Sequence, residues 1–375
     1  MKHVEEVLPW KMTDISLRPY SGMWSLNPSI HFDGTLWRCS IRCSDYCMPG
    51  GVTIRGEKAR PGENRSKNVM VIFDPQTWRA IEIYKMREQD ELPRTPCLSH
   101  GYEDIRIFST DRSGLQGIAA SLHLRRSDRT DARAQGGILK QPAEQVLLSF
   151  DDEYNISEAQ PLRGVWSAFA QKNWVPFDRC VAPRFLYSID QGTLFDERGS
   201  MRGDAAIVRH SRRSRGSLHE PRVTVLERAR RRAEETEVKR AEEARQRSKR
   251  AYKNGGQDRH APAQISPQEV MYHGLRGGSQ LVRVEEDGWL GIGHLMKFVD
   301  GLKYYYHVWY LVDSRGKMKA ASPPMKLASN GIEFAAGIAI DGDRVVVSFG
   351  VDDMECRLGE TKMSAVLEIL RPVNL

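Results

Sequence analysis

Gly101-Tyr102-Glu103-Asp104-Ile105-Arg106-Ile107-Phe108 is the stretch around which the chain is organised. It places two carboxylates and an arginine at the start of an apolar run, after an approach (93–101) that contains two prolines and ends in glycine. Prolines and a glycine before an apolar run predict a turn followed by a strand. A carboxylic acid held beside an arginine on a strand is suited to acid catalysis. The alternative is a salt-bridged strand end without a ligand, because structural ion pairs produce the same pattern.

Four further segments have the same character, being short and polar or glycine-containing at the start of an apolar run. They are Asn27-Pro28-Ser29-Ile30, Lys172-Asn173-Trp174, Arg276-Gly277-Gly278 and Ile332-Glu333-Phe334. The distance between successive segments fits a blade of four strands, once a charged insertion before Arg276 is set aside. The spacing predicts a five-bladed β-propeller whose inner strands bring all five segments to one central pocket.

The sequence between these segments is typical of an all-β protein. Short apolar runs rich in β-branched and aromatic residues recur along the chain, such as 69–73, 145–150 and 304–312. Turn signals, among them Asp341-Gly342-Asp343, separate them, and few segments have helical periodicity. Regularly spaced antiparallel strands of this kind are typical of sandwiches, barrels and propellers.

A charged segment interrupts the β pattern between residues 197 and 262. It holds 19 of the 56 Lys and Arg and 10 of the 49 Asp and Glu, so it carries a charge of +9 and leaves −2 for the rest of the chain. We expect residues 199–219 to be poorly ordered and 223–252 to form a solvated helix, since opposite charges stand four residues apart there. The chain is therefore divided into a first propeller part (1–196), the insertion (197–262) and a last propeller part (263–375).

Composition and the spacing of the cysteines indicate whether the chain is a membrane, secreted or metal-binding protein. The 375 residues are 40% hydrophobic, without an apolar run of membrane-spanning length or an apolar signal segment near Met1. We therefore expect no membrane span and a cytoplasmic protein. Cys39, Cys43 and Cys47 share one parity, which permits a metal site on a strand, but no paired Cys-x-x-Cys or flanking His completes zinc spacing. We expect buried, reduced thiols and no metal.

Several motifs fit those of a known family in order and spacing. Gly101 to Arg106 stands where that family has Gly-Val-Glu-Asp-Pro-Arg, and the other fitting segments are 172–176, 276–290, 306–307, 322–324, 332–337 and 348–353. On these residues the chain resembles the five-bladed propellers of the mannoside phosphorylase and related glycoside hydrolase family, which includes propeller domains found beside glycosyltransferases. The resemblance covers about residues 27–370 without the insertion, and Ile105 departs from it by replacing proline.

The resemblance implies a set of functional expectations. The aspartate of the family motif is the general acid, which implies that role for Asp104. Basic side chains around it bind phosphate in the phosphorylases. We expect no cofactor, with inorganic phosphate as a co-substrate if the bond is cleaved by phosphorolysis, and a carbohydrate or glycoside as the partner.

Inverting cleavage of a glycosidic bond needs an acid and a nucleophile on opposite faces of the sugar. If phosphate is the nucleophile, cations must hold it, and Arg42, Lys172 and Arg276 are the candidates. If water is the nucleophile, a second carboxylate is needed about 6.5 to 9.5 Å from the first. Glu333 and Asp353 are the candidates for that base.

Four other side chains are candidate substrate ligands: Glu103 as an orienting partner of Asp104, Arg106 in the same motif, Asn173 next to a tryptophan that a sugar can stack on, and His307 after the tyrosine run. Each basic candidate has a structural alternative. The arginines would then pair with carboxylates, and the histidine would be a satisfied core residue.

The leading prediction is a carbohydrate-active propeller that cleaves a glycoside with inversion. One alternative is a non-catalytic propeller that binds a carbohydrate or nucleotide sugar and assists a glycosyltransferase. Another uses the basic insertion (198–262) to contact nucleic acid or a protein partner, although the segment lacks the interleaved aromatic residues of a base-stacking surface.

Overall fold

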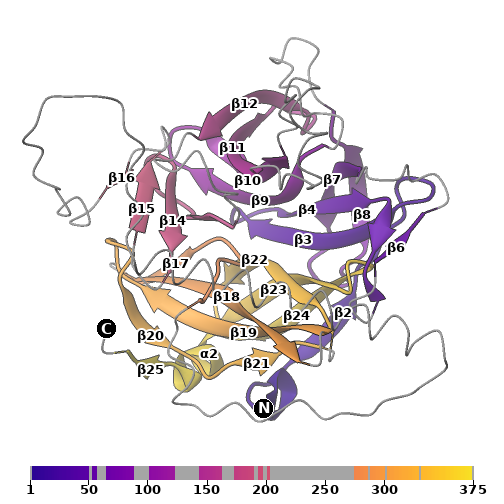
Figure 1. Ribbon diagram of the computed structural model, residues 1–375. Helices are drawn as coiled ribbons and strands as arrows, with labels where there is room; N and C mark the ends of the chain where they lie inside the picture. The colour runs from indigo at the N-terminus through magenta and orange to yellow at the C-terminus, as the bar shows by residue number, and fades with distance from the viewer. Residues whose placement is uncertain are drawn as a thin grey trace, which may run out of the picture.

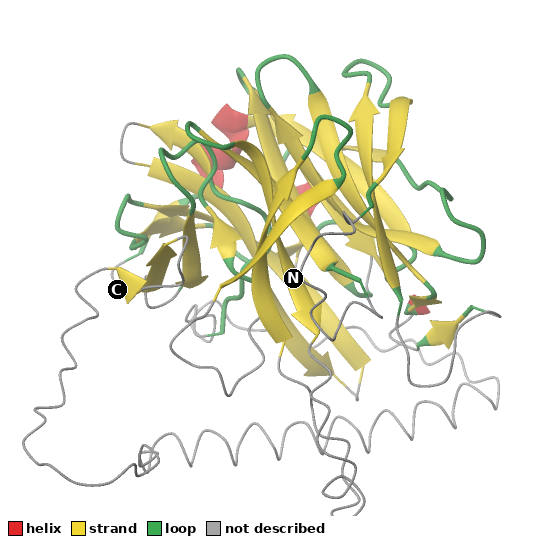
Figure 2. Cartoon of the chain, turned by 90° about the horizontal axis from the view of Figure 1, so that it is seen from above, coloured by secondary structure: helices red, strands yellow, loops and turns green. Residues whose placement is uncertain are grey.

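The computed structural model describes residues 2–49, 53–56, 65–87, 101–122, 143–162, 173–189, 193–196, 201–202, 274–285, 288–299, 302–328 and 331–373. These residues form five sheets that follow one another around a ring (Figure 1), together with a small two-stranded sheet. The arrangement confirms the prediction of an all-β, five-bladed propeller. Strands make up most of the described chain (Figure 2).

The first three blades each consist of four antiparallel strands in sequence order. The first contains β3 (Trp24–Phe32), β4 (Trp37–Ser44), β7 (Ser66–Phe73) and β8 (Ala80–Lys85), with β5 (Tyr46–Cys47) and β6 (Ile54–Arg55) paired beside it. The second contains β9 (Glu103–Thr110), β10 (Gly114–Leu122), β11 (Ala143–Phe150) and β12 (Ile156–Leu162). The third contains β13 (Val175–Pro176), β14 (Arg184–Ser188), β15 (Thr193–Asp196) and β16 (Met201–Arg202).

The last two blades include both ends of the chain. The fourth contains β17 (Val282–Glu285), β18 (Gly288–Val299), β19 (Leu302–Val312), β20 (Met318–Ala321) and β21 (Met325–Lys326), with β1 (Lys2–His3) paired to β21 and β25 (Arg371–Pro372) paired to β20. The fifth contains β22 (Glu333–Asp341), β23 (Arg344–Val351), β24 (Glu355–Lys362) and, as its outer strand, β2 (Lys11–Asp14). A short 3-10 turn η1 (Val4–Glu6) and helix α2 (Met363–Ile369) connect these strands.

The ring is closed by hydrogen bonds between the two ends of the sequence. Strand β2 runs antiparallel to β24, with Lys11 opposite Glu360 and Asp14 opposite Arg357. An N-terminal strand that completes the last blade covers an edge that would otherwise offer unpaired backbone groups. The propeller therefore depends on contacts between residues more than 300 positions apart in the sequence.

The charged insertion begins later than the sequence indicates. Met201 and Arg202, which were assigned to it, form β16 and pair with β15 in the third blade. Residues 203–273 lie outside the described residues. The expected disorder, the solvated helix and the contact with nucleic acid or protein therefore stay predictions.

Inner and outer strands differ in burial because neighbouring blades cover both faces of the inner ones. In β3 and β22 seven residues each are buried, whereas every residue of the outer strand β8 is partly or fully exposed. Strands buried on both faces are expected to be apolar nearly throughout. The polar residues of β3 and β22 are exceptions that call for partners.

Side-chain amide and hydroxyl groups fill the middle of the propeller axis. The Gln280 amide donates to the carbonyl oxygens of Ile30 at 2.6 Å and Ile338 at 2.7 Å, so it joins three inner segments. Ser348 Oγ donates to Pro28 O at 2.6 Å, and both Gln280 and Ser348 are completely buried. Such satisfied buried groups fix the strands relative to one another. They also separate the two ends of the axis.

We name these ends by the inner strands. The first mouth is the end near which the inner strands begin, marked by Asn27, Asp104, Asn173 and Arg276. The second mouth is the end where they finish, marked by His31, Asp178, Val284 and Ile340. Both sets lie on the inner segments of their blades.

Four of the five cysteines in the described part of the chain are core residues. Cys39, Cys43, Cys47 and Cys356 are buried and unbridged, as expected, and Cys180 is half-buried. Burial raises the pKa of Cys43 to about 12, which keeps its thiol protonated. In the described part of the chain, no group of His, Cys, Asp and Glu could hold a metal ion. No described helix is long and apolar enough to cross a membrane.

Candidate functional site at the first mouth of the axis

Residues with an unusual backbone conformation gather at the first mouth. Asn27, Asp104 and Asn173 have φ angles of 48°, 53° and 67°, and Asp352 and Asp353, in the turn after β23, have 52° and 49°. These are five of the eight non-glycine residues with positive φ in the described ranges. Such conformations are uncommon and cluster at functional sites, where the surrounding structure holds them. Their concentration here marks this mouth as the candidate site.

Shifts in strand register accompany these residues. The pairing of β3 with β4 shifts between Leu26 and Ser29, around Asn27. The pairing of β9 with β10 shifts between Ile118 and Ala120, opposite the start of β9. Bulges of this kind redirect side chains beside functional sites. Here they allow polar side chains from neighbouring blades to meet.

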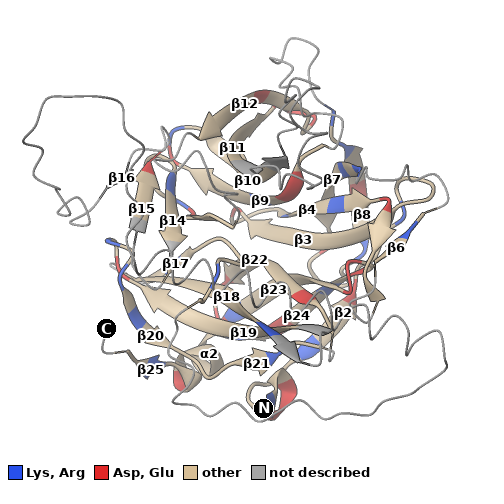
Figure 3. Cartoon of the chain, viewed as in Figure 1, with Lys and Arg blue, Asp and Glu red and all other residues tan. Residues whose placement is uncertain are grey.

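Asp104 is held by two donors from the first blade. Its Oδ1 accepts a hydrogen bond from Asn27 Nδ2 at 2.9 Å and from Arg42 Nη1 at 3.0 Å, and its side chain is 20% exposed. Both of these hydrogen bonds go to Oδ1, so they fix the orientation of the carboxyl group. A fixed orientation is one geometric requirement of a general acid. The start of β9 carries acidic residues (Figure 3).

Arg42 positions both carboxylates of the motif. Its Nη2 lies 3.2 Å from Glu103 Oε1 and 3.2 Å from the Tyr46 hydroxyl, and its Nε donates to Ser66 Oγ at 2.8 Å. Burial alone would lower the pKa of Arg42, but the charges of Glu103 and Asp104 and the Tyr46 side chain raise it well above its usual value. Arg42 therefore stays charged. With Glu103, Asp104, Tyr46 and Ser66 as partners, it holds both motif carboxylates, and its role as a phosphate ligand stays a prediction.

Arg106 connects the motif to the third and fourth blades. Its Nη2 donates to Asn173 Oδ1 at 2.8 Å, its Nε donates to the carbonyl oxygen of Gly278, and its guanidinium lies 5.4 Å from the centre of the Phe334 ring. Burial lowers its pKa to about 10, and Asp104 opposes that shift. Arg106 thus orients the Asn173 side chain, and its role as a substrate ligand stays a prediction.

Arg276, Asp353 and Tyr305 complete the described part of the site. Arg276 is exposed, and Asp353 is half-buried. Burial raises the pKa of Tyr305, the negative charges of Asp353 and Asp104 add to the shift, and Arg276 opposes it. A tyrosine that senses all three charges lies within electrostatic reach of each. The first mouth therefore combines an aspartic acid, a second carboxylate and an exposed guanidinium.

Two of the predicted site residues, Glu333 and His307, are completely buried. Glu333 is completely buried, and its carboxylate accepts hydrogen bonds from the backbone N–H groups of Leu327 at 2.8 Å and Ala328 at 2.7 Å. His307 Nε2 accepts a hydrogen bond from Ala335 N at 3.3 Å. Burial lowers the pKa of His307 to about 3, so it is neutral and its 3.8 Å approach to Glu333 is not an ion pair. Both side chains therefore have partners inside the protein, and the base role of Glu333 and the ligand role of His307 stay predictions.

The remaining differences concern residues that sequence reasoning did not place. Lys172 lies outside the described residues, so its role stays a prediction. Tyr46 and Tyr305 were missed. Tyr46 follows Arg42 by four residues, but the two side chains meet only because the chain leaves β4 after Ser44. Tyr305 stands in a run of three tyrosines, and the sequence gives no sign of which of them faces the axis.

No known protein family and no curated protein matches the chain in sequence. Among solved structures, it is similar to a β-1,2-mannobiose phosphorylase from Listeria innocua in complex with β-1,2-mannobiose, with 12% identity, a TM-score of 0.49 and coverage of 95% of this chain and 96% of that one. It is also similar to a glycosyl hydrolase from Bacteroides ovatus, with 9% identity, a TM-score of 0.49 and coverage of 94% and 86%.

A third similar structure is a mannose phosphorylase from Leishmania mexicana in complex with phosphate ion, with 10% identity, a TM-score of 0.44 and coverage of 97% of this chain and 91% of that one. Identities this low concern the course of the chain and assign no reaction. The similarity to mannoside phosphorylases and related glycoside hydrolases is one of low sequence identity, and the five-bladed propeller is shown by the sheets of this chain itself.

Proposed function

We propose that this propeller is a carbohydrate-active protein that cleaves a glycosidic bond with inversion, with Asp104 as the general acid. The observation that carries the proposal is the attachment of Asp104 Oδ1 to Asn27 and Arg42 at the first mouth. Protonation of the leaving oxygen requires a carboxylic acid whose proton points at the bond to be broken. Asp104 Oδ2 is the atom proposed to carry that proton.

Arg276 is proposed to hold the nucleophile if that nucleophile is phosphate. It is exposed at the first mouth and lies within electrostatic reach of Tyr305. A guanidinium presents parallel N–H groups that match the oxygens of phosphate. Lys172 is the second cation proposed for this role, on the sequence alone. Arg42 would act indirectly, by orienting the acid.

Asp353 is proposed as the base if water is the nucleophile. Its charge acts on Arg42, Tyr46 and Tyr305, which supports a place beside the acid. An inverting hydrolase requires about 6.5 to 9.5 Å between its two carboxyl groups, which leaves room for the water. Asn173, which Arg106 orients, supplies an amide for sugar hydroxyl groups in either reaction.

A second function is favoured by the pairing of both motif carboxylates with Arg42. Carboxylates held by a buried guanidinium are fixed hydrogen-bond acceptors, and acceptors suffice for binding sugar hydroxyl groups. In this alternative, the first mouth recognises a carbohydrate or nucleotide sugar without cleaving it, in support of a glycosyltransferase.

A panel of glycosides, with and without inorganic phosphate, separates these functions. The panel includes β-1,2-mannobiose, the disaccharide in the complex of the Listeria innocua phosphorylase. We expect wild type to release sugar phosphate or free sugar. We expect Asp104→Asn, which cannot donate the proton, to lose about 10²- to 10⁴-fold in rate. Asp341→Asn, in an exposed turn at the other end of β22, is the matched control.

The outcomes distinguish the alternatives. If Asp104→Asn turns over as fast as wild type, the acid role is wrong. If wild type binds a glycoside by calorimetry but releases no product, the binding function replaces the catalytic one. A rate that depends on phosphate and falls in Arg276→Gln supports phosphorolysis over hydrolysis.

A further inference from the structure

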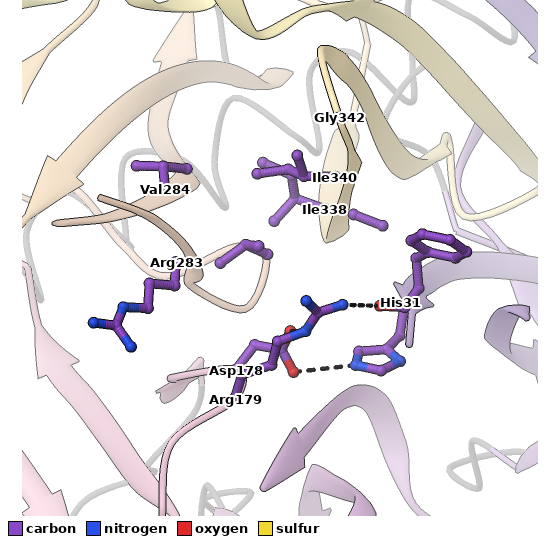
Figure 4. Close-up of a pocket in the computed structure, with 11 residues that line it drawn as sticks. His31, Asp178, Arg179, Arg283, Val284, Ile338, Ile340 and Gly342 are labelled. Atoms are coloured by element: carbon purple, nitrogen blue, oxygen red, sulfur yellow. Dashed lines mark hydrogen bonds and ion pairs between the residues drawn. The ribbon is translucent and has the colours of Figure 1, made fainter. Parts of the chain in front are cut away.

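A cavity of about 670 Å³ lies at the second mouth of the axis, away from the proposed reaction (Figure 4). It is lined by the ends of β3 and β22, by β17 and by Asp178 and Arg179 after β13. Its lining shares no residue with the first mouth, where Asn27, Arg42 and Asp104 meet. Cavities of this size accept drug-sized ligands.

The cavity has an apolar wall and a cationic wall. Apolar side chains come from three inner strands, β3, β17 and β22, and include Phe32, Val282, Val284, Ile338 and Ile340. Figure 4 shows Arg179 and Arg283 on one side of the cavity and Ile338 and Ile340 on another. A cavity that combines apolar side chains with a few convergent polar groups is typical of a small-molecule site.

The acidic residue of the lining, Asp178, is ionised and already has partners within the chain. Asp178 Oδ1 lies 3.1 Å from His31 Nε2 and accepts hydrogen bonds from Ser109 N at 2.7 Å and Ser109 Oγ at 3.0 Å. Burial would raise the pKa of Asp178, but His31 and Ser109 outweigh it and the pKa is lowered. Asp178 therefore stays negatively charged, with its carboxylate held by His31 and Ser109.

Two arginines, Arg179 and Arg283, lie on one side of the cavity. Arg179 is anchored by a 2.8 Å hydrogen bond from Nη2 to Phe32 O, with its Nε 3.8 Å from Asp178 Oδ2. Arg283 is exposed, with its guanidinium 5.7 Å from the centre of the Trp289 ring. Both also line a neighbouring cavity of about 480 Å³, so they form the wall between the two spaces. An anionic group at this wall meets guanidinium donors of both residues.

We propose that the cavity at the second mouth binds a small organic anion, with its apolar body against Ile338 and Ile340 and its phosphate, sulfonate or carboxylate group at Arg179 and Arg283. Neither half of the ligand suffices alone, since the cavity supplies an apolar wall for one and guanidinium groups for the other. The site is independent of the first mouth and of the reaction proposed there.

The test measures binding of three matched probes to the full chain by calorimetry: 2-naphthalenesulfonate, uncharged 2-naphthol and inorganic sulfate. The sulfonate is expected to bind at least about tenfold more tightly than either half. Arg283→Gln is expected to weaken its binding by at least about tenfold, because the variant loses a charged hydrogen-bond donor. Ile340→Trp, which fills the cavity, is expected to abolish binding. Arg315→Gln, in an exposed turn, and Asp104→Asn are expected to bind as wild type.

Opposite results overturn the proposal. Equal binding of sulfate and of the sulfonate means an adventitious ion only, and equal binding of 2-naphthol means an apolar patch without anion recognition. Wild-type affinity in Arg283→Gln and in Ile340→Trp places the probe elsewhere. Because Arg283 is exposed, its substitution is expected to leave folding intact, as circular dichroism and thermal unfolding of each variant verify.

Discussion

Replacing Arg42 by methionine tests the support of the candidate acid. Methionine has similar length and fills the space without charge, so the substitution mainly removes the partner of two carboxylates. Glu103, whose side chain is 7% exposed and lies 3.2 Å from Arg42, is left buried without that partner. Asp104, 3.0 Å from Arg42, is 20% exposed and partly solvated. Breaking a buried ion pair costs about 3 to 5 kcal/mol, so Arg42→Met is expected to destabilise the protein by that amount at pH 7.

The assay is urea unfolding of four proteins: wild type, Arg42→Met, Glu103→Gln and the double variant. Removing the stranded charge is expected to restore stability in the double variant, with a coupling energy of about 0.5 to 3 kcal/mol. Arg357→Gln is the control, because Arg357 pairs with Glu355 at 28% and 31% exposure and such pairs contribute about 0 to 1 kcal/mol. A cost of Arg42→Met no larger than that of the control, or strictly additive effects, would refute the reasoning.

Three other predictions concern stability. Native His307 has a pKa of about 3 against 6.5 when unfolded, so stability is expected to fall as the pH drops from 6.5 towards 3, by up to about 1.4 kcal/mol per unit. The difference between the urea midpoints at pH 7 and pH 5 should therefore be smaller in His307→Gln than in wild type. An unchanged difference contradicts a neutral native histidine. Gly277→Ala puts a Cβ 2.3 Å from Asn173 O and should lower the thermal midpoint by a cost of about 1 to 3 kcal/mol, whereas an unchanged midpoint argues against this close approach. Deleting residues 2–14 removes β2 and should expose the edge of β24, giving a lower midpoint and association in size-exclusion chromatography. A monomer as stable as wild type would show that β2 does not close the ring.

The fold was predictable because each blade repeats the same local signals. Polar or glycine-containing segments precede the inner strands, and turn residues separate the apolar runs. The structure confirms the five blades, and Met201–Arg202 shifts the boundary of the insertion, since a two-residue strand carries no periodic signal of its own. Ring closure by β2 was not foreseen, because Lys11–Asp14 contains one apolar residue and gains its partner only in the closed ring.

The candidate site was predictable in position and not in its connections. All inner strands of a propeller begin at the same end, so Asp104, Asn173 and Arg276 share one mouth. The orienting partner of Asp104 was expected within the same motif, at Glu103. The bulges near Asn27 and Ala120 and the pairing with neighbouring blades turn Asp104 towards Arg42 instead and Arg106 towards Asn173. Such choices depend on register, which short polar segments do not encode.

Complete burial distinguishes Glu333 and His307 from the other predicted site residues. Glu333 stands at the start of an inner strand, as Asp104 does, but it accepts hydrogen bonds from the backbone at Leu327 and Ala328. Sequence position alone does not distinguish a carboxylate that faces a ligand from one that holds a turn. His307 is neutral for the same reason, namely complete enclosure by neighbouring strands.

The most direct test of the central claim compares two glycosides with the same sugar and different leaving groups. A sugar leaving group needs protonation, whereas 4-nitrophenolate leaves without it, so a general acid matters for the first and little for the second. If Asp104 is the acid, kcat/KM of Asp104→Asn falls by about 10²- to 10⁴-fold on the disaccharide and far less on the nitrophenyl glycoside. Equal losses on both substrates, or no loss on either, would contradict the assignment.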